Sequence, residues 1–167
     1  MKSNISMVGA GSMSTALAVL LAKKGHSVKM WSPFKEEVEM INNVREQVHK
    51  LPGVHIPDGV TCTGDIEEAL HNTDAVILAL PSQTIRNNVK EISRFLDKDK
   101  IVVSCSKGIE QETCMLLSDV IKEEAPQVRI AALSGPSHAE EIARDIPTTV
   151  VAASREKEVA VYVQNLF

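Results

Sequence analysis

The sequence has few aromatic residues, few cysteines and no long apolar run. Only 3% of its 167 residues are aromatic while 44% are hydrophobic, so the core must be aliphatic. No run approaches the roughly 18 apolar residues of a membrane span, and the start lacks the pattern of a secretory signal. Cys62, Cys105 and Cys114 show no C-x-x-C spacing and no visible base partner. We therefore expect unreactive thiols in a cytoplasmic protein, with no metal site and no membrane insertion.

Positive charge is also scarce. The formal net charge is −4, which argues against sequence-independent binding of nucleic acid, because such binding uses a basic surface to neutralise phosphates. The length fits one ordinary domain, residues 1–167. We therefore expect a single domain with no nucleic-acid partner.

Apolar runs of strand length alternate with segments of helical period. We expect a helix over 12–24, whose apolar residues share one face, a polar helix over 34–48, and a loop over 50–59. Further helices should open at Pro81-Ser82 and occupy the C-terminal end. This alternation predicts parallel pairing with right-handed crossovers and an α/β, Rossmann-type, doubly wound, mainly parallel sheet with helices on both faces. The expected strands lie in "ISMV", "SVKMW", "DAVILAL", "KIVVSCS", "VRIAALS" and "TTVVAAS".

A glycine pattern follows the first predicted strand. Gly9 and Gly11 match the first two glycines of G-x-G-x-x-G, which permit a tight turn and a close approach of the backbone to a pyrophosphate. Ser14 replaces the third glycine, whose task is helix packing, so we expect a small shift of the helix and a retained site. The Ser14 hydroxyl should fold back on a carbonyl one turn earlier. The alternative is a glycine turn that binds no ligand.

No acidic residue follows the second strand directly, where NAD-type folds usually place one for the ribose 2′-hydroxyl. That region reads Met30-Trp31-Ser32-Pro33-Phe34. Its lack of an acid favours NADP or dual use of NAD and NADP, with Lys35 or Ser32 as the contact to a 2′-phosphate. The alternative is that Lys35 is a solvated surface residue.

Three later loops also follow predicted strands. Since ligands of open α/β sheets bind beyond the carboxyl ends of the strands, all three should share one edge with the glycine loop. Lys107 would carry a positive charge between cofactor and substrate. Ser137 and Glu140 have the spacing of a capping box, and His138 should be exposed without a catalytic role. The loops are Pro81-Ser82, Ser106-Lys107-Gly108 and Gly135-Pro136-Ser137.

These segments resemble, in order, the N-terminal half of the bacterial NAD(P)-dependent sn-glycerol-3-phosphate dehydrogenases. The resemblance covers nearly the whole chain, and "SKGIE" with "SGPSHAEE" is its specific part. It implies reversible hydride transfer between NAD(P)H and dihydroxyacetone phosphate, giving sn-glycerol 3-phosphate for glycerophospholipid synthesis. The matching segments are "GAGSMSTALAVLLAKKGHSVKMW", "LPGV", "ALPSQTIR", "SKGIE", "LSGPSHAEEIA" and "PTTVVAAS".

The resemblance also implies site residues. Substrate contacts would come from Lys107, Gly135 and Ser137. The chain departs from the family at Ser14, at Pro33 and Phe34, where an arginine or another polar residue is frequent, and at Lys50, where a tyrosine is common. Together with the glycine loop, the cofactor-binding set is Gly9, Gly11, Ser12, Met13, Pro33, Phe34, Pro81, Lys107 and Ala139.

No catalytic residue is expected in this chain. In the family, the general acid/base lysine belongs to a C-terminal helical substrate domain whose motif is absent from these residues. We therefore expect a fragment of a longer two-domain enzyme, a homodimer in its full form, that alone binds nucleotide but turns over little. Alternatives are another reductase with a similar N-terminal half, such as pyrroline-5-carboxylate or ketopantoate reductase, or a non-catalytic nucleotide-binding module.

Overall fold

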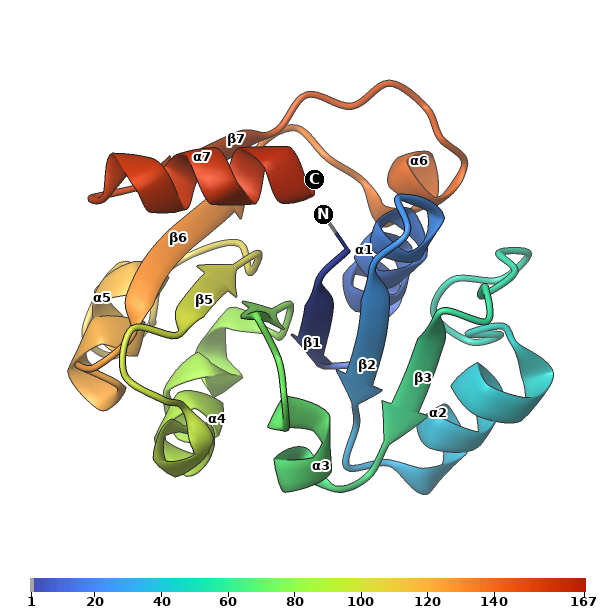
Figure 1. The fold of residues 1–167 in the computed structure, drawn as a ribbon, viewed down its shortest axis with the longest axis horizontal. Coiled ribbons are helices and arrows are strands. Elements are labelled where there is room, and N and C mark those ends of the chain that lie inside the picture. Colours follow the sequence, from blue (N-terminus) through green and yellow to red (C-terminus); the bar gives the residue numbers. More distant parts are fainter. Residues whose placement is uncertain (1) are drawn as a thin grey trace.

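A seven-stranded sheet lies between two layers of helices in the structure, a computed structural model that describes residues 2–167 (Figure 1). The strand order is β3-β2-β1-β4-β5-β6-β7, and the first six strands run parallel. The chain therefore changes direction across the sheet between β1 and β4, the switch point at which doubly wound folds bind ligands. The strands are β1 (Asn4–Val8), β2 (Ser27–Trp31), β3 (Val60–Thr63), β4 (Ala75–Leu78), β5 (Ile101–Ser104), β6 (Arg129–Ser134) and β7 (Val151–Ser154).

Each face of the sheet has its own aliphatic core. On one face α1, the π-helical turn η1, α6 and α7 contribute residues such as Leu17 and Val163, and on the other α3, α4 and α5 contribute Val89 and Ile121. The predicted two-faced architecture is confirmed. Within the described residues, no helix is long and apolar enough to cross a membrane. The helices are α1 (Ser12–Lys23), α2 (Lys35–Glu39), η1 (Met40–Val44), α3 (Ile66–Leu70), the 3₁₀ turn η2 (Ser82–Thr84), α4 (Ile85–Ile92), the 3₁₀ turn η3 (Ser93–Phe95), α5 (Leu117–Glu124), α6 (Ala139–Ala143) and α7 (Lys157–Leu166).

The last strand departs from the expected parallel pairing. β7 runs antiparallel to β6, with Ser134 opposite Val151. The connection between them, residues 135–150, contains the five-residue helix α6, which packs against α1. The chain then re-enters the sheet at the end of β6 where it left, so the two strands run in opposite directions.

The helix expected over 34–48 is wrong at its C-terminal end. α2 passes into η1 and stops at Val44, because Arg45 adopts a left-handed conformation with φ +59°. The Arg45 guanidinium then donates to the carbonyls of Ile41, Ile56 and Val60, which ties the helix end to the following loop.

Two short elements, β3 and α3, were not predicted. α3 begins at a local signal, since the Asp65 carboxylate accepts from the backbone N–H groups of Glu67 and Glu68. An aspartate two residues before a pair of glutamates could have indicated this helix start.

Candidate active site

The turn after β1 passes very close to the end of β4. Gly9 has φ +114°, and a Cβ built there would lie 3.0 Å from the Ala79 carbonyl oxygen, the Leu80 side chain and the Ser14 hydroxyl. A side chain at this position would meet both backbone strain and a rigid carbonyl. The first glycine of the pattern is therefore required by the turn itself.

Ser14 fastens this turn to the neighbouring strand. Its buried hydroxyl donates to the Ala79 carbonyl at 2.9 Å, so the expected bond to its own helix is wrong. The residue lies in the first turn of α1, next to the end of β4, where the Ala79 carbonyl is within hydrogen-bond distance. Ser14 thus occupies the third glycine position while holding α1 against the sheet.

The N-terminus of α1 is shaped to receive an anion. Gly11 is its N-cap, no side chain caps it, and a Cβ on Gly11 would meet nothing within 4 Å. The N–H groups of the first turn, from Ser12 and Met13, lack intrahelical acceptors and carry the positive end of the helix dipole. Open space beside the glycine and uncapped N–H donors are the features shared by pyrophosphate sites at helix N-termini.

A buried glutamine supports the same turn from the other side. Gln47 is fully buried, and its Nε2 donates to the Ala10 carbonyl at 2.8 Å. It comes from the segment after η1, 37 residues along the chain, and was not predicted from the sequence. Helical or strand periodicity gives no sign of such a contact.

An acid does lie at the end of β2, brought there by α2. The Glu37 carboxylate accepts from the Ser32 hydroxyl at 2.5 Å and pairs with the Lys50 ammonium, and its side chain is only 10% exposed. Ser32 is buried, and its hydroxyl also accepts from the Phe34 N–H, so the expectation that it contacts a 2′-phosphate is wrong. Pro33 and Phe34 are exposed beside it.

Lys35 supports the alternative reading of a surface residue. Its side chain is 91% exposed and lies 3.7 Å from Glu39, one helical turn along α2. Nothing holds it near the end of β2. Lys50, which departs from the family pattern, instead pairs with Glu37 beside that strand end.

Residues from the first turn of α1 and from two later loops line one small cavity. Met13 of α1, Lys107 after β5 and Ser137 after β6 all border it, as expected for loops at one sheet edge. The Lys107 ammonium donates to the Gly135 carbonyl at 2.9 Å, which joins the second and third of the later loops. Cys105 borders the same cavity, and burial raises the pKa of its thiol to about 12, so it stays protonated.

Gly135 is required by close packing. A Cβ there would lie 2.6 Å from the Thr149 carbonyl oxygen.

The capping box expected from Ser137 and Glu140 is wrong, since α6 begins at Ala139 with His138 as N-cap and no side-chain cap. The Ser137 hydroxyl instead reaches the Gly135 carbonyl at 3.4 Å. It lies one residue too early to cap the helix.

The remaining predicted residues lie at the same edge. Pro81 is the exposed N-cap of η2, three residues after the end of β4, and Ala139 is buried at the start of α6. His138 is exposed, as expected. Across residues 2–167, no three His, Cys, Asp or Glu side chains gather closely enough to hold a metal ion.

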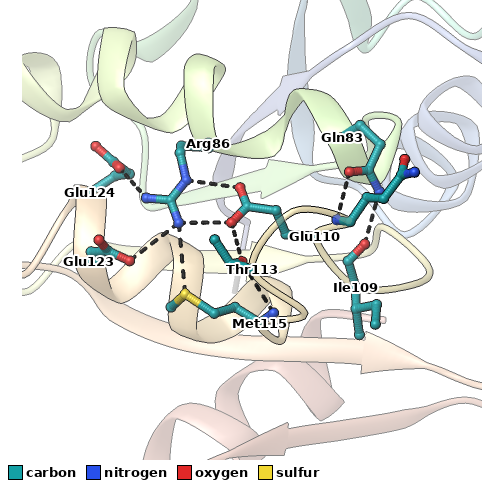
Figure 2. Close-up of polar contacts among 9 residues, drawn as sticks. Gln83, Arg86, Ile109, Glu110, Thr113, Met115, Glu123 and Glu124 are labelled. Carbon is teal, nitrogen blue, oxygen red and sulfur yellow. Dashed lines mark hydrogen bonds and ion pairs between the residues drawn. The ribbon is translucent and has the colours of Figure 1, made fainter.

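The loop that carries Lys107 is anchored to α4. Arg86 donates to both carboxylate oxygens of Glu110, at 2.8 and 2.9 Å, as Figure 2 shows. This pair, with a further bond from the Thr113 hydroxyl, lowers the pKa of Glu110 to about 2. Glu110 is therefore ionised throughout the neutral range.

Comparison with known proteins agrees with this geometry. Residues 4–160 match the family described as the NAD-dependent glycerol-3-phosphate dehydrogenase N-terminus. The glycerol-3-phosphate dehydrogenase [NAD(P)+] of Agathobacter rectalis is 46% identical over 99% of this chain and 49% of its own. The crystal structure of glycerol-3-phosphate dehydrogenase from Coxiella burnetii superposes with a TM-score of 0.93, at 28% identity, over 99% of this chain and 50% of that one. The chain thus spans about half the length of these relatives.

The substitutions Gly9→Ala and Gly11→Ala should have different effects on stability and on dinucleotide binding. Gly9→Ala forces an L-residue into strained backbone against a carbonyl and should lower the free energy of unfolding by about 2 kcal/mol or more. Gly11→Ala should change it by less than about 1 kcal/mol, yet weaken binding of a dinucleotide by about tenfold or more, since its Cβ fills the open space. Urea unfolding and calorimetric titration measure both. Equal loss of stability in the two variants would contradict this account of the loop.

Replacing Glu110 should change how stability depends on pH. Because the folded-state pKa is lowered, the ion pair stabilises the fold above the usual carboxyl pKa, and this contribution is lost as pH falls toward 2. The difference in unfolding free energy between wild type and Glu110→Gln should be constant above about pH 5 and shrink below it. The exposed Glu112, in the same loop, supplies the control Glu112→Gln. A difference that does not vary with pH would show that Arg86 gives Glu110 no net stabilisation.

Proposed function

Because the chain belongs to the NAD-dependent glycerol-3-phosphate dehydrogenase N-terminal family, we propose that it is the dinucleotide-binding part of such an enzyme. The whole enzyme would transfer a hydride reversibly between NAD(P)H and dihydroxyacetone phosphate, giving sn-glycerol 3-phosphate for glycerophospholipid synthesis. The observation that carries the proposal is the open, uncapped N-terminus of α1 at the switch point of the sheet.

The first turn of α1 would hold the pyrophosphate. The N–H groups of Ser12 and Met13 have no acceptor within the helix and would donate to the phosphate oxygens. Gly11 leaves room for these oxygens. Gly9 and Ser14 keep this turn fixed against β4, so the donors are in place before the ligand arrives. Binding therefore costs little reorganisation of the loop.

Lys107, Gly135 and Ser137 would form the substrate end of the crevice. When bound, the nicotinamide ring gives or accepts the hydride. The Lys107 ammonium lies where the loops after β5 and β6 meet, and its positive charge suits the phosphate or the developing alkoxide of the substrate. Its present acceptor, the Gly135 carbonyl, is a neutral group that an anionic substrate can replace.

The proton for the reduced carbonyl would come from outside this chain. Among the residues bordering the cavity at Met13, burial raises the pKa of the Cys105 thiol to about 12, which makes it a poor proton donor at neutral pH, and Lys107 is assigned to charge stabilisation. The family resemblance places the general acid/base lysine in a C-terminal helical domain. Half of each relative's length lies beyond the matched region, which leaves room for such a domain.

The end of β2 supports use of both NAD and NADP. Glu37 could accept from a ribose 2′-hydroxyl, as acids at this strand end do, while Lys50 offsets its charge and could face a 2′-phosphate. The exposed ring of Phe34 gives the adenine an apolar surface beside them. Neither cofactor is therefore strongly excluded by charge.

Calorimetric titration of the chain tests the proposed function. NADH and NADPH should each bind at one site per chain, and addition of dihydroxyacetone phosphate should produce no steady oxidation of either, because no proton donor is in place. Absence of binding would refute the dinucleotide-binding role. Steady turnover by these residues alone would refute the proposal that this chain binds the dinucleotide while a second domain supplies the proton.

Glu37→Gln tests the account of cofactor choice. The amide keeps the hydrogen bond with Ser32 but leaves the Lys50 charge uncompensated. The affinity for NADPH relative to NADH should rise by about fivefold, which corresponds to the roughly 1 kcal/mol of a partly exposed charge pair. Lys35→Ala is the matched control, since this lysine is exposed on the same helix, and its affinity ratio should equal that of wild type. An unchanged ratio of NADPH to NADH affinity in Glu37→Gln would show that the Glu37–Lys50 pair does not influence cofactor preference.

A further inference from the structure

Arg86 of α4 binds three carboxylates that come from two other elements. Figure 2 shows its guanidinium between Glu110, which follows β5, and Glu123 and Glu124 of α5. The bonds to Glu110 are bidentate, and the bond to Glu124 is 2.5 Å long. Arg86 is 25% exposed and Glu110 is 12% exposed, so solvent screens this group only in part. The three carboxylates more than neutralise Arg86, which therefore offers no charge to a phosphate.

Gln83, one turn earlier, holds the backbone on both sides of Glu110. Its Nε2 donates to the Ile109 carbonyl at 2.9 Å, and its Oε1 accepts from the Gln111 N–H at 2.9 Å. The side chain thus closes a ring of hydrogen bonds with the loop, visible in Figure 2. Gln83 and Arg86, from the segment η2–α4, therefore bind three consecutive residues of the loop, 109–111.

Lys107 lies between the segment held by Gln83 and Arg86 and a second point where the loop is hydrogen-bonded to the sheet. Ser106 accepts from the Leu80 N–H at 3.1 Å, so the loop is tied to the end of β4 just before Lys107. Gly108, with φ +102°, is then the one residue between Lys107 and the segment held by Gln83. The Lys107 side chain is exposed and flexible, so the direction of its ammonium depends on where its backbone is held.

We propose that Gln83 and Arg86 are positioning residues that hold the Lys107 loop against the end of β4, so that the Lys107 ammonium faces the crevice. The proposal rests on the proposed function, because that gives Lys107 its task. Arg86 acts through Glu110, and Gln83 acts through the backbone at Ile109 and Gln111. Neither touches the cofactor or the substrate.

The variants Arg86→Gln and Gln83→Ala test the proposal, each with a matched control. Arg129 is also 25% exposed and pairs with two carboxylates, Glu156 and Glu158, away from this loop. Gln127 also makes two hydrogen bonds to backbone through its side chain, donating to the carbonyls of Ser93 and Leu96. Arg129→Gln and Gln127→Ala therefore remove comparable contacts elsewhere. Gln83 is exposed, so its variant should fold even where Arg86→Gln proves unstable.

Amide hydrogen exchange and calorimetric titration of the whole chain are the two measurements. Arg86→Gln and Gln83→Ala should each speed exchange at residues 106–111 by about tenfold, and the control variants should not. Because Lys107 also belongs to the predicted cofactor-binding set, both should weaken NADH and NADPH binding by about tenfold, while the controls lose stability without losing affinity.

The two measurements separate this proposal from the proposed function. If wild type binds no dinucleotide, the proposed function fails, and exchange at residues 106–111 still decides whether the loop is held from α4. If wild type binds and the loop variants match their controls in exchange or in affinity, the positioning role is overturned.

Discussion

The candidate site depends on the contact between the turn after β1 and the end of β4. Gly9 has no room for a side chain there, and Ser14 donates to the same carbonyl, Ala79, that limits the turn. The end of β4 also fixes the next loop, because the Cys105 N–H donates to Leu78 and the Leu80 N–H to Ser106. The pyrophosphate cradle and the Lys107 loop are thus placed relative to one strand end, and hence relative to each other.

Features with a local signal could be predicted from the sequence. The continuous apolar run at 75–78 predicts a strand buried on both faces, and all four residues are buried. The apolar face of α1 and the loops at Gly9, Lys107 and Gly135 follow in the same way from periodicity and from glycine. The direction of β7 could not be predicted from the sequence, because it depends on where the chain re-enters the sheet and not on the pattern of β7 itself.

The side chains that shape the site were mostly not predictable. Gln47 reaches the glycine loop across 37 residues, and Arg86 reaches Glu110 and Glu124 across 24 and 38. Hydrophobic pattern shows which face of an element is buried, but not which polar groups meet at its end. Glu37 illustrates the difference: its place in the sequence is inside a helix, while its carboxylate lies at the end of β2.

Backbone amide NMR of the chain during titration with NADH tests the central claim most directly, because it locates the nucleotide without any substitution. The account predicts the largest shifts at Gly11, Ser12 and Met13, with further shifts at Phe34 and Lys107. A second hollow, bordered by Asp119 of α5 and by Arg155 just after β7, offers a distinct alternative location. Shifts confined to that hollow, with the residues of the glycine loop unmoved, would contradict the account.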